Sequence, residues 1–263
     1  MKDPEKLNEI YGETVSLITP SGCSVVIRQQ TGEDDDTISN AVDSEDGTSI
    51  NKFVAAIVVD SDIIPNGKLS LPDILKMKLC DKYFILIASR IFSIGQILKF
   101  SFKWENILEP VDYEEDLAKF IWDYSKKEFP FNPTDPDYFP SRIKPHIHGK
   151  ELSRDFTIRS GKKLRYNFYN GEGERYLLKL SEGLQSRNQE FIARELSWFV
   201  EDKWIKIQNF RSFTSIDMVD IRKDIDENDP AVNLNSELEN PLTHEKINYP
   251  IVGTMDFFFP REI

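Results

Sequence analysis

The sequence predicts an α+β protein of two similar modules joined by a proline-rich segment. Three observations lead to this prediction: short β-rich runs flank Pro/Gly turns, helical patterns separate those runs, and one order of elements occurs twice along the chain. With 263 residues, 40% of them hydrophobic, the chain can bury one large core or two small ones. We divide it into a flexible N-terminus (1–13), a first module (14–105), a proline-rich connecting strap (106–153) and a second module (154–263).

The first module opens with a predicted β-hairpin. Apolar runs at 15–18 and 25–27 flank the turn-forming residues Pro20-Ser21-Gly22. A polar and acidic stretch follows, in which a short helix can begin. The apolar run 51–59 comes next, and it fits either a helix or a strand.

The clearest helix signal covers residues 69–95. Ser70 and Asp73 have the spacing of a capping box, and Pro72 is tolerated in a first helical turn. Gly95 ends the second helical segment of this stretch. Residues 97–104 then alternate apolar and polar side chains, which predicts a closing strand.

The connecting strap is defined by its prolines. Five of them lie between Pro130 and Pro145 and predict an irregular, extended backbone. A short helix is expected before them, within 111–129. Aromatic side chains, among them Tyr138 and Phe139, favour an ordered strap or an interdomain linker over a loose chain.

The second half repeats the plan of the first. A hairpin, a Gly-Glu pair, a helix, a capped helix and a closing strand follow in the same order, so we infer a duplicated module. The matching features, first half to second, are Ser21-Gly22 to Ser160-Gly161, Gly32-Glu33 to Gly171-Glu172, 50–58 to 187–196, Ser70 and Asp73 to Thr214 and Asp217, and the strand 97–104 to an expected strand in 251–260.

Charge and cysteine content restrict the classes of partner. Asp and Glu number 45 against 33 Lys and Arg, and a net charge of −12 disfavours nucleic acid as a partner. Cys23 and Cys80 lie far apart, which predicts no disulfide framework and fits a reducing compartment. We expect neither a secretory signal at the N-terminus nor a membrane-spanning segment, and therefore folding in a cytosol without a membrane partner.

One histidine pair is a candidate metal site. His146 and His148 would share one face of an extended strand, and a third ligand could come from Glu151, Asp155 or His244. No H-E-x-x-H or C-x-x-C motif accompanies the pair. We therefore favour two solvent-facing histidines and expect no metal.

Other polar motifs also favour structural roles. The acidic run 33–36 lacks the alternating ligands of a calcium loop and fits the first turn of a helix. Gly171-x-Gly173 lacks the rest of a phosphate loop and fits a turn. The chain has three histidines and no G-x-S-x-G motif, although paired carboxylates stay open among so many acids. We expect no catalysis, no cofactor and no small-molecule substrate.

Four segments carry a resemblance to a known family. They are SGCSVVIRQQTGEDDD (21–36), the stretch 73–104, DMVDIRKDI (217–225) and DFFFP (256–260). In these the chain resembles the baseplate hub proteins of T4-like contractile-tailed bacteriophages, over roughly residues 14 to 260. The resemblance implies a hub subunit or a hub assembly factor, with other baseplate or tail proteins as partners.

The same resemblance bears on location and on metal. It implies residence in the host cytoplasm during assembly, and in the virion tail if the subunit is a lasting one. The opening S-G-x-x-V-x-I-R with T-G-E is also similar to phage tail assembly chaperones, so a transient chaperone is the alternative. Some relatives carry paired cysteines after the strand 97–104, but WENILEP at 104–110 has none, so no zinc site is expected.

Aromatic residues are the candidate partner contacts. Phe100, Phe102 and Trp104 share one face of the predicted strand 97–104, where burial in the core is the favoured interpretation. The expected terminal strand carries Phe on both faces, so a partner subunit could cover the second face. The candidates are Phe257, Phe258, Phe259, Tyr138, Phe139 and Trp104.

Overall fold

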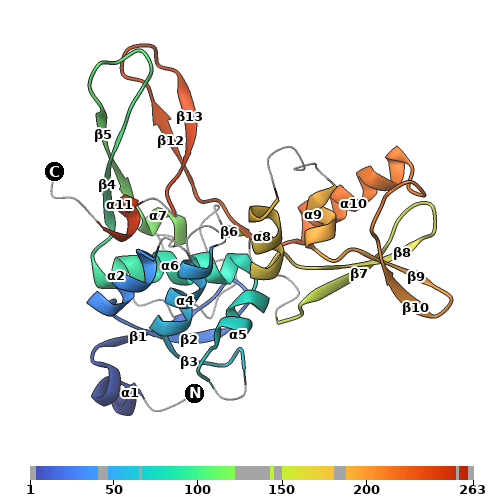
Figure 1. Cartoon of the computed structure of the whole chain (residues 1–263), viewed down its shortest axis with the longest axis horizontal. Coiled ribbons are helices and arrows are strands. Elements are labelled where there is room, and N and C mark those ends of the chain that lie inside the picture. The colour runs from blue at the N-terminus through green and yellow to red at the C-terminus, as the bar shows by residue number, and fades with distance from the viewer. Residues whose placement is uncertain are drawn as a thin grey trace.

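The computed structural model describes residues 4–40, 47–64, 67–121, 143–144, 150–180, 188–252 and 255–259. Helices and antiparallel sheets combine in these residues, as the α+β prediction requires. Figure 1 shows two bodies side by side, with an arm of two hairpins rising from the larger one. Each body has its own hydrophobic core.

The first body is built on a three-stranded antiparallel sheet in the order β1-β2-β3. The predicted hairpin is confirmed, with Gly22 at a positive φ of 74° in its turn. Helices surround this sheet, and the run 51–59 divides into a helix and the third strand. The elements are α1 (Pro4–Tyr11), β1 (Thr14–Ile18), β2 (Ser24–Arg28), α2 (Gly32–Ile38), α4 (Thr48–Ile57), β3 (Val58–Ser61), α5 (Leu71–Lys76), α6 (Leu79–Ser93) and α7 (Ala118–Ile121).

The long predicted helix is two helices joined at a corner. α5 begins at the predicted capping box of Ser70 and Asp73. Met77 and Lys78 then take extended conformations, with ψ of 141° and 140°, and α6 begins directly after them. α6 is buried on nearly all sides between Phe84 and Ala88, so it forms the centre of the first core.

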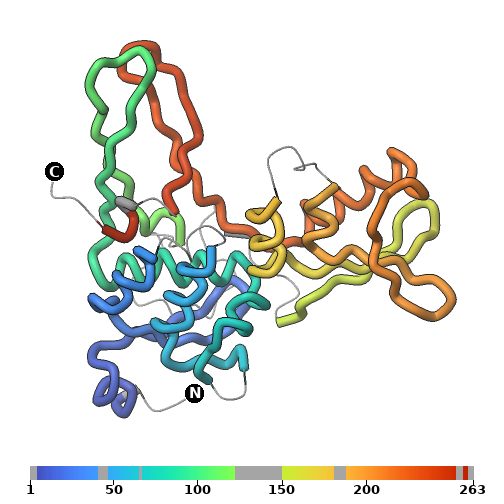
Figure 2. Tube along the Cα trace, in the orientation of Figure 1, coloured from blue at the N-terminus to red at the C-terminus, as the bar shows by residue number. Residues whose placement is uncertain are grey.

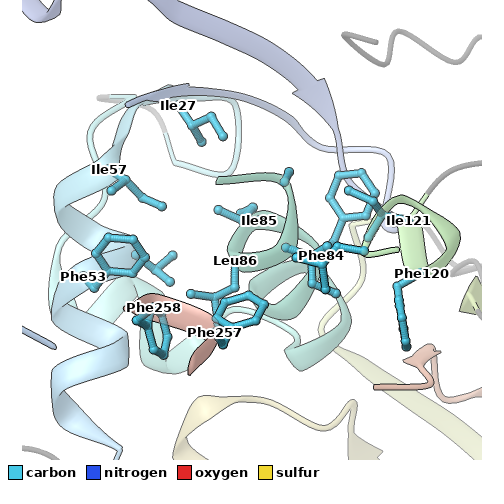
Figure 3. Packing of buried hydrophobic residues seen from close by; sticks show 14 of the residues in the cluster. Ile27, Phe53, Ile57, Phe84, Ile85, Leu86, Phe120, Ile121, Phe257 and Phe258 are labelled. Carbon is cyan, nitrogen blue, oxygen red and sulfur yellow. The ribbon is translucent and has the colours of Figure 1, made fainter. Parts of the chain in front are cut away.

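Figure 3 shows how distant segments meet in this core. Ile27 from β2, Ile57 from α4 and Phe84 from α6 converge with Phe257 from the last helix, α11 (Met255–Phe258). The prediction of a terminal strand in 251–260 is therefore wrong. A short helix presents Phe257 and Phe258 to the same core, where both are buried. Phe53 packs edge-on against Phe258 at 5.9 Å, and the Arg90 Nε donates to the Phe257 carbonyl at 2.8 Å.

The second body is a four-stranded antiparallel sheet in the order β10-β9-β8-β7, with one face covered by α10. The hairpin predicted for the second half of the chain is confirmed as β7 and β8, and Gly161 has a positive φ of 82° at its turn. The Thr214 and Asp217 capping box begins α10, as predicted. The elements are β7 (Ser153–Thr157), β8 (Lys163–Asn167), α8 (Gly171–Leu178), α9 (Gln189–Ala193), β9 (Ser197–Val200), β10 (Lys203–Lys206) and α10 (Ser215–Asn228).

After α10 the chain returns to the first body. β11 (Ala231–Val232) pairs with β6 (Ile143–Lys144), and the hairpin β12 (Asn235–Glu239)–β13 (Lys246–Pro250) lies beside the hairpin β4 (Ile97–Phe102)–β5 (Val111–Asp116). The segment expected as one second module, 154–263, thus divides between two cores. The first core likewise continues past residue 105 into β5 and α7, because α7 packs against α6 and the apolar residues of β5 pack against the same core.

Main-chain bonds join the two bodies directly. The Leu79 N–H donates to the Tyr169 carbonyl at 2.9 Å, and Lys78 forms a β-bridge with Asn170. A Cβ on Gly171 would lie 3.0 Å from the Leu75 Cα, so only glycine lets α8 approach α5 this closely. Gly171, the first glycine of the Gly171-x-Gly173 motif, is therefore required for the close packing of the two helices.

Candidate functional site

The paired hairpins β4–β5 and β12–β13 form an arm whose two halves come from opposite ends of the sequence. The rings of Phe100 and Tyr249 stack at 5.1 Å with an interplanar angle of 3°. The Trp104 Nε1 donates to the Tyr113 hydroxyl at 2.8 Å, and that hydroxyl donates to the Glu239 carbonyl at 2.9 Å. Aromatic packing and hydrogen bonds therefore make the arm one rigid projection.

The end of the arm is its most exposed apolar feature. In Figure 2 the loop between β4 and β5 and the loop between β12 and β13 end side by side, and the Asn240 Nδ2 donates to the Asn106 Oδ1 at 2.8 Å between them. Leu108 is 92% exposed on the first loop and Leu242 is 68% exposed on the second. We call these two loops, 103–110 and 240–245, the arm tip.

Two exposed leucines on a rigid projection are suited to entering an apolar pocket of a partner. A buried leucine contributes about 1.5–3 kcal/mol relative to an exposed one, and a rigid arm loses little conformational entropy on docking. Glu105, Glu109 and Glu245 are exposed in the loops of the arm tip against one exposed lysine, Lys103, so the arm tip carries an excess of acidic side chains. A surface complementary to the arm tip would be an apolar hollow with basic side chains at its edge.

Four of the predicted partner contacts are wholly or partly buried within their own chain. Trp104 is buried inside the arm, and Phe257 and Phe258 are buried in the first core, with Phe259 packed partly against it. These side chains are covered by their own chain, which leaves them little surface for another subunit. Tyr138 and Phe139 lie outside the described residues.

Leu108 and Leu242 were missed by sequence reasoning. Leu108 follows Ile107 in NILEP, and Leu242 stands alone in NPLTH, and neither segment has apolar periodicity. The available signal is a large apolar residue inside a turn-forming segment, where packing does not require one.

Apart from the arm tip, a polar cluster lies at the junction of the two bodies. The ammonium of Lys82, a residue 1% exposed, bonds to the Glu174 carboxylate and to the Asn51 Oδ1. The Tyr83 hydroxyl donates to the same carboxylate. Burial lowers the pKa of Lys82, opposed by the charge of Glu174, and burial followed by that charge raises the pKa of the Tyr83 phenol. The charged groups of this cluster pair with one another, whereas the Asn51 Nδ2 is buried without a hydrogen-bond partner, and the pairing of Lys82 and Tyr83 with Glu174 locks α6 to α8.

Another polar cluster surrounds the turn between β1 and β2. Asp81 is buried in the first turn of α6 and accepts a hydrogen bond from the Ser21 N–H at 3.0 Å. Burial raises the pKa of Asp81, and the charge of Lys78 opposes that shift. Burial also raises the pKa of the Cys23 thiol to about 11, so the thiol is protonated near neutral pH and is a poor nucleophile.

The remaining candidate sites have structural partners where they are described. Within the acidic run, Asp34 in the first turn of α2 forms a two-bond ion pair with Arg28, at 2.7 and 2.9 Å. Asp155 is bound by Arg165, and the His244 Nδ1 lies 2.7 Å from Glu239. In the described ranges no group of three or more His, Cys, Asp and Glu side chains is placed to hold a metal ion. His146 and His148 lie outside those ranges.

Comparisons with known proteins add no relative. No family model matches the chain, and neither a curated protein nor a solved structure matches it. Within the described part of the chain, the helices are too short or too polar to cross a lipid bilayer.

Proposed function

We propose that this chain is a protein-interaction component of a contractile phage tail baseplate, and that it engages a partner through the arm tip. The exposed pair Leu108 and Leu242 carries the proposal for the contact. The resemblance over residues 14 to 260 supports the hub as its setting. The proposed role is attachment without catalysis.

We also infer that the two bodies descend from one duplicated module. In each body a hairpin is followed by two helices and by a strand that pairs with the second hairpin strand, as in β2 with β3 and β8 with β9. A helix with a capping box and a further hairpin follow in both. Superposing β1–β3, α2 and α4 on β7–β9, α8 and α9 should give one topology, and different strand directions or crossovers would refute the duplication.

Purified virions distinguish a lasting subunit from an assembly chaperone. Mass spectrometry of intact particles should detect a hub subunit at a fixed ratio to the other baseplate proteins. If the chain co-purifies with hub proteins from infected cells but is missing from particles, the chaperone alternative holds. If it associates with tail proteins in neither sample, the proposed function fails.

The arm tip is tested by charge insertion. Leu108→Asp combined with Leu242→Asp should reduce recovery of tail proteins on the tagged chain by at least about tenfold, because two apolar contacts are lost. Leu178→Asp is the matched control, since Leu178 is a leucine 53% exposed on α8, away from the arm. Equal loss of partners in the control would show that the effect is not specific to the arm tip.

A further inference from the structure

A pocket of about 200 Å³ opens beside the turn between β1 and β2. It is lined on its apolar side by residues that follow β3, by the end of α5 and by the segment before β7. Lys76 and Lys150 are exposed and lie at its edge. The apolar lining residues are Ile63, Ile64, Met77 and Leu152.

The size of this pocket fits a side chain better than a free ligand. Sites for drug-sized ligands measure about 300–1,000 Å³, whereas a cavity of about 150 Å³ accepts a single benzene molecule. A pocket of about 200 Å³ is therefore large enough for one leucine side chain and little more.

Most polar groups in the wall of the pocket already have partners within the chain. The carboxylate of Asp81 already accepts the Ser21 N–H, and Asp73 is held in the capping box of α5. The Cys23 thiol is protonated near neutral pH because burial raises its pKa to about 11. At the edge, the Lys150 Nζ lies 2.8 Å from the Asp62 Oδ2 and is already paired, so the groups left to interact with an occupant are the apolar wall, the Ser21 hydroxyl and Lys76.

The arm tip has the complementary chemistry. Leu108 is almost fully exposed, and the acids Glu105 and Glu109 are exposed on the same loop. Apolar surface would meet apolar surface, and a carboxylate of the arm tip would meet the ammonium group of Lys76. The pocket thus matches the partner surface that the arm tip requires.

We propose that the arm tip of one copy of this chain inserts Leu108 into this pocket of a second copy, with Glu109 beside Lys76. The inference rests on the proposed function, since it names a partner for the arm tip. Figure 1 shows the arm rising away from the first body, whereas α5, which lines the pocket, lies on the side of that body near α8, so the arm tip of a chain does not reach its own pocket. The contact joins two different surfaces, and repeated copies close into a ring or extend as a filament.

Sedimentation velocity over a range of concentrations tests the contact. The purified full-length chain should form larger species as its concentration rises. Leu108→Asp on the arm tip and Leu152→Asp in the pocket should each weaken association by at least about tenfold, the effect of losing one buried leucine contact. Leu178→Asp should associate as the wild type does. A wild type that stays monomeric at every concentration overturns the proposal.

Mixing the two variants provides a second measurement. Each is defective on one surface and intact on the other, so an equimolar mixture should form a dimer and nothing larger. Glu109→Lys should also weaken association, and Lys76→Glu in the partner copy should restore it. A mixture that stays monomeric, or variants that assemble like the wild type, overturns head-to-tail docking.

The proposed function and this inference fail in different ways. If the wild type is monomeric but Leu108→Asp still loses tail proteins in the co-purification, the arm tip binds another baseplate protein and the self-association is wrong. If the wild type self-associates through the arm tip but recovers no tail protein, the docking stands and the baseplate assignment fails.

Discussion

Replacing Phe257 with alanine distinguishes burial in the core from contact with a partner. Phe257 is 0% exposed in the first core, its ring lies 5.0 Å from that of Phe258, and its carbonyl accepts a bond from Arg90. Phe→Ala at a fully buried position costs about 3–5 kcal/mol, from lost transfer free energy and from the cavity left behind. We expect a loss of that size in the isolated chain, out of a total stability of about 5–15 kcal/mol for a typical protein.

Urea titration followed by circular dichroism measures this change in the free energy of unfolding. The denaturant midpoint should fall, and the slope of the transition should stay the same if unfolding remains cooperative. Leu178→Ala is the control and should change stability by less than about 0.5 kcal/mol, because Leu178 is exposed. A Phe257→Ala protein as stable as the control would refute the placement of α11 in the first core.

Three further predictions concern charge and turn geometry. Glu174→Gln should destabilise the protein by about 3 kcal/mol by leaving Lys82 buried without its counter-charge, and adding Lys82→Met should recover part of this loss in a double-mutant cycle of urea titrations. Glu201 and Asp202 have positive φ values of 49° and 60° in the β9–β10 turn, so Glu201→Asn with Asp202→Gly should raise the thermal midpoint, by about 0.5–1 kcal/mol in stability. Burial opposes ionisation of Asp34, but the bonds from Arg28 and Thr31 outweigh it and lower the pKa; the resulting stability should therefore be present above about pH 3.8 and be lost as the pH falls further through the folded-state pKa. Unfolding free energies of Asp34→Asn and wild type should then converge in acid, and a constant difference would contradict the ion pair.

Local chemistry explains what could be predicted of the fold. The hairpins were predictable because Gly22 and Gly161 mark turns that need a positive φ. The starts of α5 and α10 were predictable because the capping boxes of Ser70 and Thr214 satisfy main-chain N–H groups within four residues. Each of these signals involves residues that are neighbours in the sequence.

The terminal helix was mispredicted because its conformation depends on contacts in the first core. DFFFP has aromatic side chains in consecutive positions, so its local pattern does not separate a strand buried on both faces from a short helix that presents neighbouring aromatic residues to a core. The choice depends on Phe53 and Arg90, which lie more than 160 residues away in the sequence. Tertiary contacts decided the conformation where local propensity was weak.

The same argument applies to both candidate interaction surfaces. The arm joins residues 97–116 to residues 235–250, and the pocket joins the turn before β2 to α5 and to Leu152. Neither surface exists in any single segment, so no motif could mark it. Leu108 becomes a candidate contact only when the second hairpin fixes its loop in space, because an exposed leucine on a loose loop would lose in ordering entropy much of what burial contributes. The arm would therefore make Leu108 a binding group by holding its loop in one position. Weakening the Phe100–Tyr249 stack should impair docking even with both leucines intact.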